Sequence, residues 1–163
     1  MIDIANPRQI VLVTCRAVVN NFGKQELKDN ITTIIWHSPL SNEPKMYCIS
    51  IHKQRFSHEL LSKSKVFCVN FMDVNYESHV LFCKNNTGNN LDKFIATGLT
   101  KMEAQKIDCS LIKEASAHLE CEIINEIETG DHILFLARVL NDKLYRKDKR
   151  IFHISGDEFS TII

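Results

Sequence analysis

Residues 30–58 place the strongest constraint on how this chain can fold. Two apolar runs in this stretch, residues 31–36 and 46–51, are rich in β-branched and aromatic side chains, which favour strands. A polar loop bounded by Pro39 and Pro44 separates the runs. Because the second run leads into a helix start, the stretch predicts a strand–loop–strand–helix unit, which suits a flat polar ligand with an anionic end.

The helix start reads Arg55-Phe56-Ser57-His58, and we expect a helix over residues 57–65 with Ser57 as its N-cap. A helix N-terminus presents unpaired N–H groups and partial positive charge, which together attract phosphate. Arg55 adds a planar fork of donors that can bind two phosphate oxygens. A surface arginine beside an ordinary capped helix has the same local sequence, so both interpretations stay open at this point.

Charge and length exclude several classes of protein. A chain of 163 residues favours one domain, over residues 1–163, with a sizeable core. Its 20 basic and 20 acidic residues cancel, so neither a nucleic acid nor a membrane surface is expected as a partner. No apolar run approaches the roughly 20 residues that cross a bilayer.

The cysteines and histidines indicate neither disulfides nor a metal site. The six cysteines include no Cys-x-x-Cys pair, and no signal peptide is recognised at the N-terminus. We therefore expect small buried thiols and a cytoplasmic location. The seven histidines are scattered without the spacing of metal ligands, so no metal is predicted.

The rest of the chain alternates short strands with a helical middle segment. Strands are expected at residues 10–15, 66–71, 119–123, 132–140, 150–154 and 159–163. Within residues 75–117, helices are expected after Asn75, over residues 91–97 with a stop at Gly98, and at a capping box in residues 100–103. Strands that do not alternate with helices favour an antiparallel barrel or sandwich with peripheral helices.

Seven segments, in order along the chain, resemble motifs of the flavin reductase-like family, the FMN-binding split-barrel proteins that include flavoredoxin. They are residues 7–14, the block Asn30-x-x-Thr33-x-x-Trp36-x-x-Pro39-Leu40-Ser41 with Pro44 and Ser50-Ile51, Arg55-Phe56-Ser57-His58-Glu59-Leu60, Phe67-x-Val69-Asn70, Thr87-Gly88 with Asp92-Lys93-Phe94, Leu119-Glu120-Cys121, and Gly130-Asp131-His132. The resemblance extends from Pro7 to about Leu140, although the segment between Gly23 and Asn30 is longer than is usual in the family.

The resemblance implies a mainly β fold, a six-stranded antiparallel split β-barrel of Greek-key type with peripheral α-helices. It also implies a homodimer with FMN along the barrel edge near the subunit interface. The residues expected to flank the isoalloxazine ring are Thr33, Ile35, Trp36, Ser38, Pro39, Leu40 and Ser41. Those expected at or near the phosphate are Ser50, Arg55, Ser57 and His58, and Asn30, Ile51 and Phe56 complete this part of the set. Lys93 and Phe94 are expected to reach the flavin from the helical segment.

The implied activity is hydride transfer from NAD(P)H to flavin. Such a step needs no general base, in keeping with a chain that has no catalytic triad. His132 resembles the histidine near the nicotinamide or flavin in family reductases and is the expected catalytic residue, although a turn residue bonded to Asp131 would have the same sequence. A flavoredoxin-type FMN electron carrier, reduced by a redox partner protein, and a ferric-chelate reductase remain alternatives.

Overall fold

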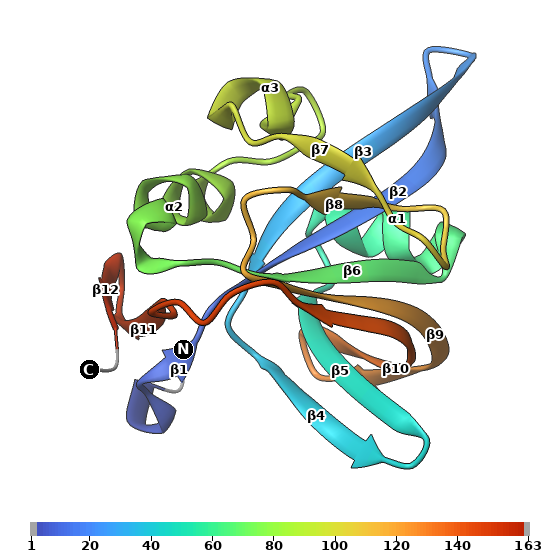
Figure 1. Cartoon of the computed structure of the whole chain (residues 1–163). Helices are drawn as coiled ribbons and strands as arrows, with labels where there is room; N and C mark the ends of the chain where they lie inside the picture. The colour runs from blue at the N-terminus through green and yellow to red at the C-terminus, as the bar shows by residue number, and fades with distance from the viewer. Residues whose placement is uncertain (1–2, 162–163) are drawn as a thin grey trace.

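The centre of the molecule is a curved antiparallel sheet, seen in a computed structural model that describes residues 3–161 (Figure 1). Its seven strands have the order β3-β2-β6-β9-β10-β5-β4. Their bounds are β2 Val11–Asn21, β3 Lys24–Ile34, β4 His37–Asn42, β5 Lys45–His52, β6 Val66–Phe71, β9 Ala117–Thr129 and β10 His132–Leu144. The expected antiparallel split barrel with peripheral helices is therefore confirmed.

The sheet has one strand more than the six expected, because residues 37–42 form β4 rather than a loop. Pro39 lacks an N–H, but β4 is an edge strand that pairs only with β5, so its outer side needs no donor. β3, at the opposite edge of the sheet, connects to β4 through only Ile35 and Trp36. This link spans roughly 11 Å at most between the Cα atoms of Ile34 and His37, so the two edges must meet. The sheet therefore curls into a barrel that is split beside this link.

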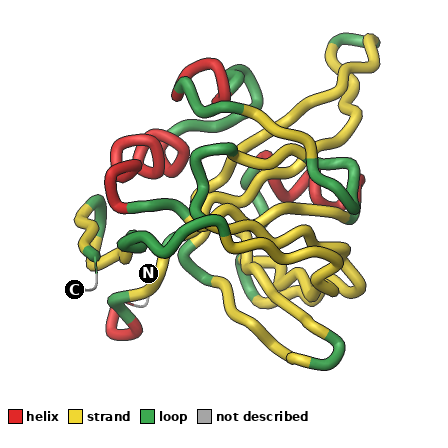
Figure 2. Tube along the Cα trace, in the orientation of Figure 1, coloured by secondary structure: helices red, strands yellow, loops and turns green. Residues whose placement is uncertain are grey.

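The remaining elements lie around the barrel, and Figure 2 shows that helices are a minor part of the chain. The helices are α1 Phe56–Ser64, α2 Glu77–Asn85 and α3 Lys93–Thr97, with short 3-10 turns at Asp3–Ala5 and Val74–Tyr76. Two small sheets join β1 Arg8–Gln9, β11 Phe152–Ser155 and β12 Glu158–Ser160, and β7 Lys101–Glu103 with β8 Ser110–Ile112. No helix within residues 3–161 is long and apolar enough to span a bilayer.

Three local predictions concern the middle and the end of the chain. The capping box at residues 100–103 is wrong, because this segment is β7 and Glu103 bonds instead to Arg16 of β2, with Oε1 at 2.8 Å from Nη2. The expected stop at Gly98 is confirmed, since Gly98 follows α3 with a left-handed φ of 72°. The final strand ends at Ser160, and residues 162–163 of the predicted strand lie outside the described part of the chain.

Two layers of apolar side chains cover the two faces of β2, which explains its unbroken apolar sequence. Val11, Val13 and Cys15 point into the barrel, where they join Phe135 and other core residues. Leu12 belongs to a second cluster beneath α2 and α3. All six cysteines are buried and free, as the sequence predicts.

Replacing Phe135 with alanine tests the barrel core. Phe135 is fully buried in the barrel interior, so we expect Phe135→Ala to lower the free energy of unfolding by about 3–5 kcal/mol. Urea denaturation of the purified chain measures the change. Ile95→Ala, at a side chain that is 81% exposed on α3, is the control and should change stability by no more than about 0.5 kcal/mol. Equal losses in the two variants would contradict this packing.

Candidate functional site

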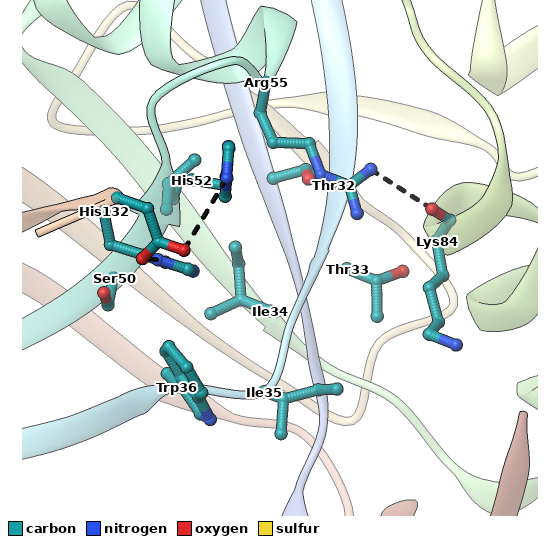
Figure 3. A pocket seen from close by; sticks show the side chains of 12 residues that line it. Thr32, Thr33, Ile34, Ile35, Trp36, Ser50, His52, Arg55, Lys84 and His132 are labelled. Atoms are coloured by element: carbon teal, nitrogen blue, oxygen red, sulfur yellow. Dashed lines mark hydrogen bonds and ion pairs between the residues drawn. The ribbon is translucent and has the colours of Figure 1, made fainter. Parts of the chain in front are cut away.

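A pocket opens at the split of the barrel, beside the link between β3 and β4. Its volume is about 310 Å³. One wall is the end of β3 with the link, the second is the end of β5, and His132 and Lys84 lie on opposite sides (Figure 3). The lining residues are Thr32, Thr33, Ile34, Ile35, Trp36, Ser50, Ile51, His52, Arg55, Lys84, Asp131 and His132.

Aromatic and imidazole rings gather at one end of the pocket. The rings of Trp36 and His132 have centroids 4.7 Å apart, and the His52 ring lies edge-on to His132 at 5.2 Å. His132 Nδ1 lies 2.6 Å from Asp131 Oδ1, and this hydrogen bond holds the pKa of the Asp131 carboxyl below its usual range. This end offers flat ring surfaces and a carboxylate that stays ionised.

Positive charge lies at the other end. Arg55 donates from Nη1 to the Lys84 carbonyl oxygen at 3.2 Å, and it has no carboxylate partner within residues 3–161. The Lys84 ammonium is occupied, because it binds the Gly156 carbonyl oxygen at 2.8 Å and also the Asp157 carboxylate. The Arg55 guanidinium is thus available to an anion.

A smaller hollow of about 100 Å³ continues from the pocket, sharing Thr32 and Arg55 with it. Lys93 lies in its wall and is only 3% exposed. Its Nζ donates to the Ile31 and Cys83 carbonyl oxygens at 2.7 and 3.0 Å, and no carboxylate within the described residues neutralises it. Burial lowers the pKa of Lys93 to about 8. The ammonium has a third proton, so it remains able to donate to an anion in the hollow.

The hollow also contains an unsatisfied acceptor and a close backbone approach. Asn30 Nδ2 donates to Ser57 Oγ at 2.9 Å, while the buried Asn30 Oδ1 has no partner among the described residues. A Cβ on Gly88 would lie 1.9 Å from that oxygen, so only glycine fits here. A ligand with hydroxyl groups could donate a hydrogen bond to this buried acceptor, and an anionic group on the same ligand could bind the nearby cations.

The pocket and the hollow together form one groove, and the structure brings most of the predicted site residues to it. Thr33, Ile35, Trp36, Ser50, Ile51, Arg55 and His132 line the pocket, and Asn30, Phe56, Ser57 and Lys93 line the hollow. His58 lines a third depression that adjoins the hollow at Arg55. The groove does not include Ser38, Pro39, Leu40 and Ser41, which lie on the edge strand β4, or Phe94 of α3, which is buried in the second apolar cluster.

The expected N-cap is wrong. The N-cap of α1 is Arg55, without a side-chain capping bond, and Ser57 is the second residue of the helix. Ser57 is buried, and its hydroxyl accepts from Asn30 rather than from a helix N–H. The Ser57 hydroxyl therefore bonds to Asn30 of β3 and, contrary to the prediction from the local sequence, does not cap the helix. No side chain caps the N–H groups of the first turn.

Several lining residues were missed by sequence reasoning. Thr32, Ile34, His52, Lys84 and Asp131 line the pocket, and Gln54, Asn86, Thr87 and Gly88 line the hollow. Of these, Asp131, Thr87 and Gly88 lie in the motifs that resemble the family, but they were not among the expected site residues. Strand alternation gives a signal for His52, which lies two residues after Ser50 and so on the same strand face. Lys84 reaches the pocket from α2, and no local pattern indicates this.

Comparison with known proteins identifies a family that the sequence matches. The family model described as "Flavin reductase like domain" matches residues 5–156. An uncharacterized protein from Archaeoglobus fulgidus is 32% identical over 114 residues, which are 70% of this chain and 64% of that protein, so the chain spans less than two thirds of this relative.

Two solved structures show the same fold. An FMN-binding protein from Thermus thermophilus with bound cyclohex-2-enone has a TM-score of 0.86 and 20% identity over 99% of this chain and 89% of that one. An NADH:FAD oxidoreductase from Streptomyces globisporus has a TM-score of 0.81 and 22% identity over 97% and 87% of the two chains.

The buried Lys93 ammonium predicts a characteristic pH dependence of stability. Below pH 8 the folded chain holds a charged, desolvated lysine, whereas from pH 8 to 10.5 it has released a proton that the unfolded chain still binds. Folding is therefore favoured as the pH rises through this window. We expect the stability of the wild-type chain, relative to Lys93→Met, to increase between pH 8 and 10.5 in urea denaturation.

Lys113→Met, at an exposed lysine, is the matched control and should reproduce the wild-type pH dependence. A wild-type chain whose stability relative to Lys93→Met stays constant across this window would contradict the buried ammonium.

Proposed function

The chain belongs to the flavin reductase-like domain family, and we propose that it binds FMN in the groove at the barrel split and reduces flavin with NAD(P)H. Membership confirms the resemblance drawn from the sequence. One observation carries the proposal, namely that a single groove joins a ring-lined end at Trp36 and His132 to uncompensated cations at Arg55 and Lys93. FMN has the matching form, a flat ring system linked to a phosphate.

The residues of the hollow fit the phosphate end of FMN. Arg55 and Lys93 would bind phosphate oxygens through N–H donors that lack carboxylate partners. The N-terminus of α1, which no side chain caps, adds partial positive charge at the same place. The orphan Asn30 Oδ1 would accept from a hydroxyl of the sugar-alcohol chain, and the missing Cβ of Gly88 lets the loop lie against this oxygen without a clash.

The pocket fits the ring end. Trp36 and Ile35 supply apolar surface, and the hydroxyl of Thr32 has no hydrogen-bond partner within residues 3–161, so it is available to the ring edge. When bound, FMN supplies a ring that accepts two electrons from a nicotinamide and passes them on. The chain itself would position the ring and place His132 beside it, which is what hydride transfer requires of a protein.

A homodimer is part of the same proposal. Ser38, Pro39, Leu40 and Ser41 lie outside the groove of their own chain, on an edge strand whose outer side is unpaired. An unpaired edge with an exposed Leu40 is a natural contact for a second subunit, and there these residues would approach a ligand from the partner side.

An absorption spectrum with NADH or NADPH tests the function. We expect the purified chain, loaded with FMN under anaerobic conditions, to show a visible flavin absorption band. Either nucleotide should bleach this band within seconds in a stopped-flow experiment. A chain that binds FMN but ignores both nucleotides would contradict the reductase and support an electron carrier that a partner protein reduces. A chain that fails to bind FMN would contradict the proposal that FMN is the ligand of the groove.

Arg55→Ala tests the phosphate end separately. Because the variant removes a charged donor from the groove, we expect FMN binding to weaken by about 1.5–3 kcal/mol in isothermal titration. Arg138→Ala removes an exposed arginine of β10 outside the groove and should leave the affinity unchanged. An unchanged FMN affinity in Arg55→Ala would contradict the assignment of Arg55 to the phosphate of FMN.

A further inference from the structure

We propose that Asp131 and His52 are positioning residues that hold His132 with its Nδ1 protonated and its Nε2 directed to the pocket. The inference rests on the proposed function for its chemical consequence, but its geometry stands on the chain alone. His132 would be the group that touches the ligand, and the other two side chains would act through it.

The Asp131–His132 contact fixes where the imidazole carries its proton. An ionised carboxylate can only accept hydrogen bonds, and the hydrogen bond from His132 keeps the pKa of Asp131 low, so the carboxylate is ionised. His132 Nδ1, at 2.6 Å from Asp131 Oδ1, must therefore be the donor. The other ring nitrogen, Nε2, has no hydrogen-bond partner within residues 3–161, and His132 lines the pocket. Nε2 is the free atom of this ring.

His52 supports the carboxylate from its other side. The Gln54 backbone N–H donates to His52 Nδ1 at 3.2 Å, so the proton of a neutral His52 must lie on Nε2. Nε2 faces Asp131 Oδ2 at 3.9 Å, which is an electrostatic contact rather than a hydrogen bond. The dashed line from His52 in Figure 3 marks this contact. The carboxylate thus lies between two imidazoles, each of which offers it an N–H.

Strand pairing and ring packing leave His132 little freedom. His52 and His132 are direct partners in the β5–β10 register, so both side chains lie on the same face of the sheet. The Lys53 N–H donates to the Asp131 carbonyl oxygen at 3.0 Å, which fixes the turn before β10. Trp36 packs on His132 with an interplanar angle of 38°. These contacts orient the ring before any ligand enters.

The orientation has a chemical use in the proposed reaction. Reduction of flavin by NAD(P)H transfers two electrons and one proton as a hydride, and it consumes one further proton from the surroundings. A protonated His132 can give its Nε2 proton to an acceptor in the pocket and keep its Nδ1 proton on the hydrogen bond to Asp131. The neutral ring that remains is the tautomer that Asp131 stabilises, so the carboxylate favours donation from Nε2 alone.

Nitrogen-15 NMR of the imidazoles tests the arrangement without any flavin. At a pH well above the ordinary histidine pKa of about 6.5, we expect neutral His132 as the Nδ1–H tautomer and neutral His52 as the Nε2–H tautomer. Free histidine prefers Nε2–H, so the His132 signal would be unusual. A wild-type His132 that is mainly Nε2–H would overturn the inference, whatever the chain does with nucleotides.

Three variants complete the test. Asp131→Ala should return His132 to the Nε2–H preference of free histidine and slow flavin reduction about tenfold, while His52→Gln should give a smaller change of the same sign in both readouts. Asp142 lies on the same strand as His132, β10, and forms an exposed ion pair with Lys45 of β5. Asp142→Ala is therefore the control and should change neither readout. An Asp131→Ala variant that keeps the Nδ1–H tautomer would overturn the role of the carboxylate.

The two proposals fail in different ways. If NADH and NADPH leave bound FMN oxidised while His132 is the Nδ1–H tautomer, then the reductase proposal fails and the geometry stands. If reduction is fast but the tautomer of His132 is Nε2–H, then the reductase stands and the positioning roles of Asp131 and His52 fail.

Discussion

The structure depends on a link of two residues, Ile35 and Trp36, between the two edge strands of the main sheet. A link this short cannot cross an open seven-stranded sheet, so it is compatible only with a sheet that curls until its edges meet. The closure is incomplete, because β3 and β4 do not pair with each other. The groove lies at this gap, and Trp36, which belongs to the link, forms part of its wall. The constraint that closes the barrel therefore also creates the place where a ligand can enter.

The charges of the groove show that this region is not arranged for stability alone. A buried ammonium without a carboxylate costs free energy in the folded chain, and Lys93 receives only two carbonyl oxygens in return. The Arg16 cluster on β2 is a useful contrast, because there a buried guanidinium is neutralised by Asp29, Glu103 and Asp108. The same chain can thus satisfy a buried cation with its own carboxylates. An unsatisfied cation in the hollow is consistent with an anion that arrives from outside.

Local sequence predicts those parts of the fold that local physics determines. The apolar runs, the turn before β10 and the stop at Gly98 follow from side-chain type and backbone freedom, and the structure contains them. The errors arise where a pairing partner decides: β4 becomes a strand through pairing with the neighbouring β5, and Glu103 leaves its capping box for the distant Arg16. The site divides in the same way. A strand or helix-start motif indicates Thr33, Trp36 and Arg55, whereas Lys84 and Gly88 reach the groove from a helix and a loop whose positions only tertiary packing sets.

Strand register connects the core of this protein to its chemistry. In the β5–β10 pair, Ile51 is opposite Ile133 and packs into the barrel core, while the next pair, His52 and His132, lies on the other face beside Asp131. Side chains alternate with a period of two, so a shift of one residue in either strand would turn a histidine into the barrel core and an isoleucine out of it. The free energy that keeps Ile51 and Ile133 in the core is therefore the same free energy that keeps the two imidazoles opposite each other. The Asp131–His132 contact therefore depends on the hydrophobic packing of the neighbouring pair, and a substitution of Ile133, which packs against the core and does not line the pocket, would disturb the orientation of Nε2.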